Sequence, residues 1–306
     1  MKVDETLVML EEGVKSVFTS ENYQEYLRIM SRFTDYSASN CILIFSQMPT
    51  ATHVAGYRDW QNKFGRQVKK GARGIRIIAP MMVKEKNGNH HENSNGNHHE
   101  NSNGKNHDKQ SRNHHENSNE YNHLTSSGNE SEKEKKKLRF RVATVFDVSM
   151  TEGKPLPTFG VDELTGSVDN FERFMEVITL TTPVPIRYDN IEGGAKGYYS
   201  RQSKEIVIQA GMSETQTLKT CLHEISHFLL HDNDNTKDRQ TREVEAESVA
   251  SIVSAFFNIK TDDYSWPYIA SWSSGKELKE LKNSLETIRK TAKQLIETIT
   301  KEMEKK

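Results

Sequence analysis

The stretch "TCLHEISHFLLHD" at residues 220–232 contains two histidines four residues apart, with a glutamate directly after the first. Apolar residues around them recur at helical spacing, so we expect one helix that carries His223, Glu224 and His227. The two histidines are one turn apart and can therefore reach the same ion. In this HExxH arrangement Zn²⁺ acidifies a water molecule, and the glutamate accepts its proton as the water attacks a carbonyl group. We predict such a zinc site, with His223 and His227 as ligands and Glu224 as general base.

A catalytic zinc ion usually has a third protein ligand. The stretch "QTREVEAESVASIVSAFF" at 240–257 offers three glutamates on a second apolar helix. Glu243 and Glu247 share one face, whereas Glu245 lies about 200 degrees round the helix from Glu243 and is expected to point away. We choose Glu243 as the third ligand and expect Glu247 to accept a hydrogen bond from the second nitrogen of a ligand histidine. An ordinary solvated face of glutamates is the alternative. The ligand set favours zinc and also accepts manganese or cobalt.

Two further roles near this site stay open. His231, one turn beyond His227, either orients a substrate or simply ends the helix. Stabilisation of the transition state beyond the ion itself has three candidates, Tyr198, Tyr199 and Tyr268.

A basic segment in the first half of the sequence indicates a different kind of binding site. The stretch "YRDWQNKFGRQVKKGARGIR" at 57–76 interleaves aromatic side chains with lysine and arginine. Cations bind phosphates and flat rings stack on bases, a combination that holds single-stranded nucleic acid without reading its sequence. The alternative is a solvated basic loop whose aromatic residues belong to the core. The residues that we expect to contact DNA are Tyr57, Arg58, Trp60, Lys63, Arg66, Lys69, Lys70, Arg73 and Arg76.

Helices and a hairpin should position the basic segment. We expect a helix capped by Ser20 and another over residues 37–48. Two β-rich stretches, 74–83 and 138–148, form an antiparallel hairpin whose tip carries an insert at 87–137. The insert holds three copies of "HHENSN" and eight of the chain's 12 histidines. It is too polar to offset the entropy cost of ordering, so we expect a disordered, solvated segment, with metal collection by paired imidazoles as the alternative.

We expect the predicted metal ligands to lie in a second domain. Glycine and proline mark 151–166 as a linker between domains at 1–150 and 167–306. We expect a helix near 168–179, strands around 185–191 and 204–210, and then three helices. The last helix starts with Ser274 and Glu277 in capping-box spacing, and its leucine-rich stripe either packs on its own domain or forms a coiled-coil dimer. The fold class is α+β: a helical N-terminal domain with a β-hairpin, and a zincin-like domain with a long C-terminal helix.

Composition narrows the class of protein. The 306 residues are 34% hydrophobic with a net charge of −1, which suits a globular chain. The start "MKVDETLVML" lacks the basic beginning of a signal peptide, and no run of 18 apolar residues occurs, so we expect a cytoplasmic protein with no membrane partner. Cys41 and Cys221 are too few for a disulfide framework and are expected to be reduced, buried thiols.

The motifs resemble two known families. "LHEISHFLLH" followed by "REVEAESVA" resembles the ImmA/IrrE class of metallopeptidases. That resemblance implies zinc ligation by His223, His227 and Glu243 and the base role of Glu224, while the family's usual asparagine is Glu247 here. Residues 36–80 and 145–157 resemble the N-terminal single-stranded-DNA-binding domain of ArdC-type antirestriction proteins. The whole chain is similar to LtrC-like members found on conjugative elements.

The resemblances imply a two-part protein of mobile DNA, and three hypotheses follow. In the first, the chain binds single-stranded DNA and its zinc site hydrolyses a host or regulatory protein, shielding transferred DNA from restriction. In the second, it is a DNA-binding protection module with a structural, non-hydrolytic zinc ion. In the third, it is an ImmA-like protease that cleaves a repressor. The oligomeric state and the protein substrate stay open.

Overall fold

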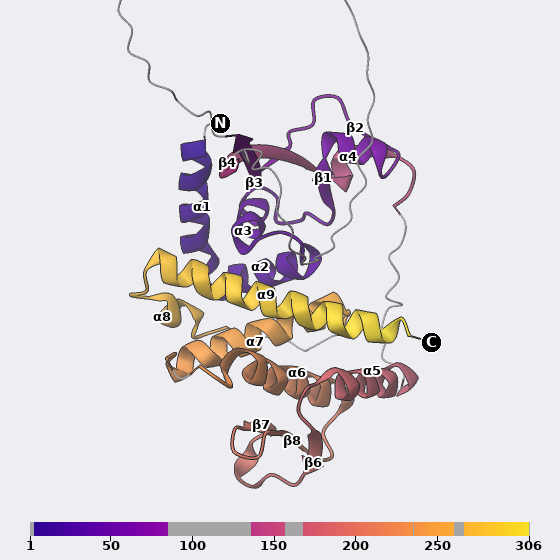
Figure 1. The fold of residues 1–306 in the computed structure, drawn as a ribbon, viewed down its shortest axis with the longest axis vertical. Helices are drawn as coiled ribbons and strands as arrows, with labels where there is room; N and C mark the ends of the chain where they lie inside the picture. Colours follow the sequence, from indigo (N-terminus) through magenta and orange to yellow (C-terminus); the bar gives the residue numbers. More distant parts are fainter. Residues whose placement is uncertain (1–2, 85–135, 157–167, 235, 260–265, 306) are drawn as a thin grey trace, which may run out of the picture. The chain divides into compact units, whose positions relative to one another are not determined.

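A computed structural model describes residues 3–84, 136–156, 168–234, 236–259 and 266–305 of the chain. Its backbone divides into two compact units, one formed by residues 1–79 and 141–306 and the other by Pro80–Phe140. Helices and strands are mixed, as expected for the α+β class (Figure 1). No helix in the described ranges combines the length and the apolar character that crossing a membrane requires.

Three helices open the chain: α1 (Val3–Val17), α2 (Ser20–Arg32) and α3 (Ala38–Gln47). The helix expected after Ser20 is present, but its cap is Thr19, whose Oγ1 accepts from the backbone N–H of Asn22 at 3.4 Å. Ser20 is instead the first helical residue. The apolar face of α2 is fully covered, and Cys41 of α3 is a buried free thiol, as expected.

The strands β3 (Ile75–Lys84) and β4 (Lys136–Asp147) neighbour each other, as predicted, in a sheet of order β1-β4-β3. The strand β1 (Val54–Gly56) pairs antiparallel with β4 and leads into the short helix α4 (Tyr57–Asn62). Strand β4 begins at Lys136, so it includes residues 136 and 137 of the predicted insert. The rest of the predicted insert, 87–135, lies outside the described residues.

The predicted linker starts with a strand. Residues Thr151–Gly153 form β5, which pairs antiparallel with β2 (Arg66–Val68), and residues 157–167 lie outside the described part of the chain. Sequence reasoning missed β5 because its partner is distant in the chain and its residues have no alternating pattern. The division into domains at this point stays a prediction.

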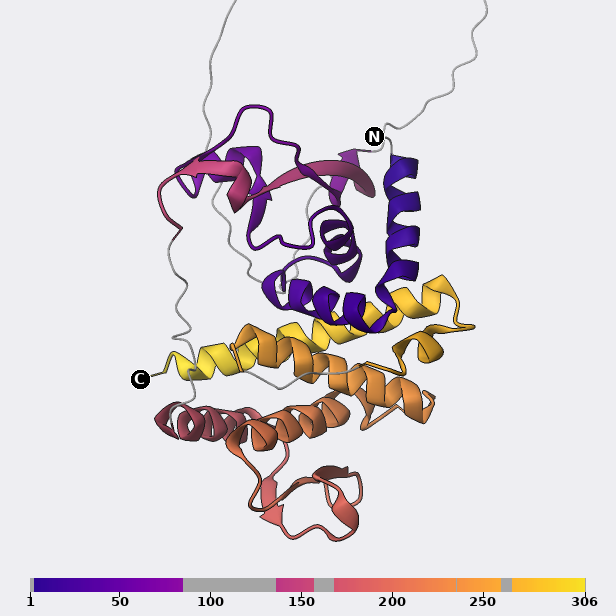
Figure 2. The ribbon, with the colours of Figure 1, turned by 180° about the vertical axis from the view of Figure 1, so that it is seen from behind.

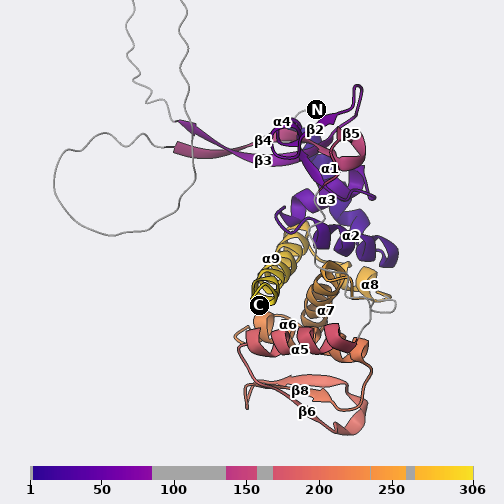
Figure 3. The ribbon, with the colours of Figure 1, turned by 90° about the vertical axis from the view of Figure 1, so that its right-hand side faces the viewer.

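The second half starts with α5 (Val168–Thr181), followed by a sheet of order β6-β8-β7. The strand β6 (Ile186–Asp189) is parallel to β8 (Glu205–Gln209), and β7 (Gly197–Ser200) is antiparallel to it. Figure 3 shows this sheet on one side of the helical layer that contains α5 and α6 (Glu214–His231). The central strand β8 is apolar and fully buried at its middle, which fixes the sheet against the helices.

Three further helices complete the chain: α7 (Arg239–Phe256), the short α8 (Ile269–Ser273) and α9 (Leu278–Met303). The capping box expected at Ser274 and Glu277 does not form, since Ser274 ends α8 and Glu277 makes no side-chain cap bond. Helix α9 lies along α7 (Figure 2) and also contacts α5 and α3, which supports intrachain packing over a coiled coil. The buried members of its stripe are Leu281, Leu285, Ile288, Ala292, Leu295, Ile296 and Ile299.

Candidate metal centre

One face of helix α6 lies in the hydrophobic core, and another faces helix α7. Ser213 caps it, accepting from the N–H of Gln216, and Leu218, Cys221 and Leu222 lie in the core. The opposite side of the motif faces α7, which packs closely along α6. The apolar spacing that predicted the helix therefore also determines that its histidines point toward the second predicted helix.

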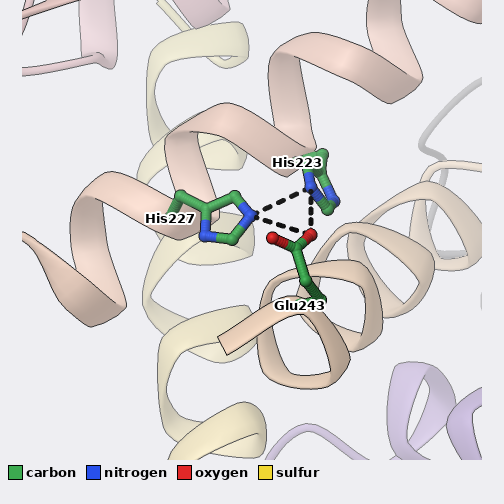
Figure 4. Close-up of side chains that lie close together, drawn as sticks. All are labelled: His223, His227 and Glu243. Atoms are coloured by element: carbon green, nitrogen blue, oxygen red, sulfur yellow. Dashed lines mark hydrogen bonds and ion pairs between the residues drawn. The ribbon is translucent and has the colours of Figure 1, made fainter. Parts of the chain in front are cut away.

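His223 and His227 meet Glu243 between the two helices (Figure 4). The Nε2 atoms of the histidines are 3.0 Å apart, and Oε2 of Glu243 is 3.5 Å from that of His223 and 3.4 Å from that of His227. Ligands held tetrahedrally at about 2.0–2.1 Å from zinc lie about 3.3 Å from one another. The spacing and the chemistry of the three donors thus fit one divalent ion.

The three groups are electrostatically coupled in the metal-free protein. Burial lowers the pKa of His223, but the carboxylates of Glu243 and Glu247 outweigh burial and raise it to about 10. Hydrogen bonds with His223 and His227 hold the pKa of Glu243 far below its usual range. Without an ion, the proton on His223 supplies the positive charge that balances these carboxylates. Metal binding must therefore release that proton.

Glu247 lies behind His223, where sequence reasoning expected it. Its Oε2 is 2.8 Å from Nδ1 of His223, which leaves Nε2 of the same ring to face Glu243. Nζ of Lys219 is 3.4 Å from the other carboxylate oxygen of Glu247. Sequence reasoning missed Lys219, although its position one turn before His223 is a signal that could have been used.

Glu224 is buried, with 7% of its surface exposed, and its carboxyl is next to strand β7. Burial raises the pKa of Glu224, partly offset by the neighbouring histidines and by a hydrogen bond from the backbone of Tyr199. Gly197 makes this close approach feasible: a Cβ there would be 2.6 Å from Cγ2 of Thr220 and 3.3 Å from Cγ of Glu224. The proposed base is therefore enclosed between α6 and the edge strand.

Glu245 points away from the three donors, as expected, and is completely buried. Its carboxylate binds Nζ of Lys237 at 2.7 and 3.0 Å and accepts from Ser284 at 2.8 Å. His231 is only 2% exposed and lies 3.7 Å from Glu245, and burial lowers its pKa to about 4. Of the two roles considered for His231, the structure favours the one at the helix end, since a substrate cannot reach it.

The three candidate tyrosines differ in their surroundings. Tyr199 donates to Oδ1 of Asp232 at 2.6 Å, which ties β7 to the end of α6. Tyr198 is on the edge strand and is 41% exposed. Burial and the carboxylates of Glu247 and Glu243 raise the pKa of Tyr268 to about 12. The Tyr268 hydroxyl thus stays neutral at neutral pH.

Two residues of the basic segment use their side chains for hydrogen bonds within the fold and do not present them at a free surface. Trp60 is 1% exposed and donates from Nε1 to the carbonyl of Phe146 at 2.8 Å, so no base can stack on its ring. Arg66 donates to Oγ1 of Thr151 at 2.7 Å and to two carbonyls of β5. The sequence could not separate these residues from their exposed neighbours, because the segment has no long periodic element.

All but one of the other predicted contacts are exposed. Tyr57 is 51% exposed. Lys63 pairs with Asp59 at 3.0 Å and Lys69 donates to the carbonyl of Ser149 at 3.0 Å, yet both stay solvent-accessible. Arg76 is partly buried, while three residues of the set are exposed: Arg58, Lys70 and Arg73.

Comparisons with known proteins match each half of the chain. Residues 3–146 match the family model of the N-terminal domain of anti-restriction factor ArdC, and residues 184–290 match that of the IrrE N-terminal-like domain. A curated relative is the uncharacterized protein pXO2-81 of Bacillus anthracis, 25% identical over 96% of this chain and 50% of its own length. The chain thus spans about half the length of the curated relative that it matches.

Solved structures extend the comparison to the fold. The metal-free crystal structure of antirestriction protein ArdC from plasmid R388 is 18% identical, with 88% of this chain and 85% of that chain covered and a TM-score of 0.50. The Mn(II)-bound structure of the same protein is 16% identical, with coverage of 88% and 86% and a TM-score of 0.49. The metal-free form shares the fold of this chain.

Proposed function

We propose that this chain, which joins the N-terminal domain of the ArdC anti-restriction family to an IrrE-like domain, binds single-stranded DNA and hydrolyses a protein substrate at a zinc site. The observation that carries the hydrolytic half is the convergence of His223, His227 and Glu243 within the spacing of one coordination sphere. Two imidazoles and one carboxylate at this spacing favour zinc over a hard, six-coordinate ion.

The residues around the donors have distinct roles in this proposal. When bound, zinc supplies Lewis acidity that polarises a peptide carbonyl and acidifies water. Glu224 accepts the proton of the attacking water and passes it to the leaving amine, and its raised pKa brings it closer to the working pH of a general base. We assign to Tyr268, whose raised pKa keeps its hydroxyl neutral at that pH, the donation of a hydrogen bond to the developing oxyanion.

DNA binding is assigned to the exposed part of the basic segment. Tyr57 offers a ring for stacking, and the cations Arg58, Lys70 and Arg73 are accessible to phosphates. Trp60 and Arg66 are removed from the proposed contact set because their side chains are committed to the fold. The ArdC family description connects this half with anti-restriction, so we place the protein's action on incoming DNA.

The deciding experiment compares the wild type with Glu224→Gln, which leaves all three donors in place. We expect peptide hydrolysis to fall by about 10²- to 10⁴-fold, while zinc content and DNA retention stay unchanged. Glu297→Gln, an exposed site on α9, is the matched control. If Glu224→Gln still protects DNA fully in cells, hydrolysis is unnecessary and the zinc ion of a DNA-protection module is structural. Cleavage of a repressor with no effect on DNA protection would favour the ImmA-like alternative.

Metal identity has its own test. Protein purified without a histidine tag should contain one equivalent of zinc by elemental analysis, and Glu243→Gln should lose it. Manganese or cobalt in its place would refute the assignment of zinc while leaving the donor set intact.

A further inference from the structure

The distal part of the β3–β4 ribbon carries the most exposed group of apolar side chains on a strand element of the described chain. We define it as the arm, residues 80–83 of β3 and 137–140 of β4, all within the unit Pro80–Phe140. We propose that the arm is a binding surface for single-stranded DNA, where Phe140 stacks on a base and Lys137 and Arg139 contact phosphates. This proposal rests on the proposed function and adds a surface that the basic segment does not include.

The arm exposes large apolar side chains of a kind that are usually buried. Phe140 is 59% exposed and Leu138 is 53% exposed on β4, and Met82 is 61% exposed on β3. Further along the same strand, Val145 is only 5% exposed. Side chains of β4 are therefore buried near its C-terminal end and exposed in the arm. Apolar groups left open on a folded chain commonly mark a contact surface for another molecule.

The pleat of β4 sorts the side chains of the arm. Alternate residues point to opposite faces, so Leu138 and Phe140 share one face and Lys137 and Arg139 share the other. Figure 3 shows β3 and β4 as a two-stranded ribbon, in which the two faces are separated by a single layer of backbone. The long lysine and arginine side chains can reach past the edge of such a thin layer. A flexible strand can then place bases on the apolar face and phosphates near the cations.

Charge decides between the occupants of an exposed apolar face. The arm segments read "PMMV" and "KLRF", which contain two cations, Lys137 and Arg139, and no acid. A protein partner or a second copy would have to neutralise that charge, whereas a polyanion is attracted to it. Stacking on Phe140 further requires bases that are not already paired, which favours a single strand over a duplex. We therefore commit to single-stranded DNA as the occupant.

The arm also supplies what the basic segment lacks. Of the aromatic residues predicted there to stack, Trp60 is buried and bonded to Phe146, which leaves Tyr57 as the exposed ring of that set. Proteins that bind single-stranded nucleic acid without sequence preference stack successive bases on several aromatic rings rather than on one. Phe140 is a further ring of this kind on the described surface.

The test uses the full-length chain and fluorescence anisotropy with a labelled oligothymidine of about 20 nucleotides, longer than a typical binding site. Phe140→Ala removes an exposed ring and should not disturb the core. We expect it to weaken binding by about 5- to 100-fold. The double variant Lys137→Ala/Arg139→Ala should reduce the slope of log affinity against log salt by about 1.4, that is about 0.7 for each lost phosphate contact on a single strand.

Matched controls are available on helices. Leu180→Ala removes an apolar side chain that is 65% exposed on α5, and Lys279→Ala/Lys290→Ala removes two exposed cations from α9. Both should bind the oligonucleotide as the wild type does, and circular dichroism should show every variant folded. Equal effects of control and arm variants would overturn the proposal.

The remaining outcomes separate this inference from the proposed function. If the wild type binds and Phe140→Ala binds equally well with an unchanged salt slope, the arm is not the surface, and DNA binding itself stands. If the wild type does not bind at all, the proposed function fails first. If the arm variants lose binding only to vesicles of anionic phospholipid, or lose only self-association in sedimentation, the committed occupant is wrong.

Discussion

The hydroxyl of Tyr23 lies 2.7 Å from Oγ of Ser248, and both side chains are completely buried. This contact joins α2 of the ArdC-like half to α7, the helix that carries Glu243 and Glu247. Two further bonds connect the same halves: a carboxylate oxygen of Glu286 accepts from the N–H of Ala38 at 2.9 Å, and Arg289 donates to the carbonyl of Thr34 at 3.0 Å. Helix α7 thus packs against the N-terminal helix α2, and the core is continuous across the two.

Removal of that hydroxyl should therefore destabilise the whole chain. We expect Tyr23→Phe to lower the free energy of unfolding by about 1 kcal/mol, because Ser248 keeps its bond to the carbonyl of Val244 while one buried hydrogen bond is lost. Tyr57→Phe, at an exposed ring, is the control. In thermal unfolding, zinc should raise the midpoint of a single transition. Two separate transitions, of which only one responds to zinc, would contradict this coupling.

The pH dependence of the metal-free protein should follow His223. Its pKa rises from 6.5 to about 10 on folding, so its contribution to stability is fully present below pH 6.5 and is lost as the pH rises toward 10. Urea denaturation in chelator should accordingly show stability that falls across this interval. His223→Gln should flatten the profile, and saturating zinc should do the same because the ion replaces the proton. A wild-type profile that is flat without metal would refute the assigned coupling.

Lys219 should influence zinc affinity without touching the ion. It holds Glu247, which in turn lies against Nδ1 of His223. We expect Lys219→Met to weaken zinc binding by about 10-fold, in the range for partners of metal ligands. Lys219→Arg should restore most of the affinity because it keeps the positive charge. Calorimetric zinc titration measures both variants, and equal losses would indicate that the charge of the side chain is irrelevant.

Gly197 should be needed for the close approach of β7 to the base. We expect Gly197→Ala to cost about 1–3 kcal/mol of stability through overpacking, because its Cβ would be 2.6 Å from Cγ2 of Thr220. Thr220→Ser removes that methyl group, so the double variant should recover part of the loss. Gly56→Ala is the control, since its nearest contact is a carboxylate oxygen of Asp59 at 3.4 Å. Without any recovery in the double variant, the clash is not the cause.

Local periodicity in the sequence accounts for much of the geometry of the candidate metal centre. Residues one turn apart on a helix share a face, so the spacing of His223 and His227, and of Glu243 and Glu247, already determines which atoms can meet. The same rule places Glu245 away from the donors, as observed. What it cannot give is the distance between the two helices, which tertiary packing sets.

The basic segment shows where such reasoning fails. Charge and aromatic character are visible in a sequence, but exposure is not, and a three-residue strand such as β2 has no period to read. The burial of Trp60 depends on Phe146, and the bonds of Arg66 depend on Thr151, both far along the chain. Long-range partners of this kind are invisible to local patterns. The same holds for the capping box expected at Ser274, because Ser274 is the C-cap of α8 and not the N-cap of α9.

Four side chains between residues 243 and 248 fix helix α7: Glu243 faces His223 and His227, Glu245 faces Lys237 and Ser284, Glu247 faces His223, and Ser248 faces Tyr23. A single inserted residue upstream of 243 would turn all of them by about 100 degrees at once. The contacts of this helix therefore depend on the number of residues in it as well as on their types. Descendants of this chain should therefore vary in the length of their loops while this segment keeps its count.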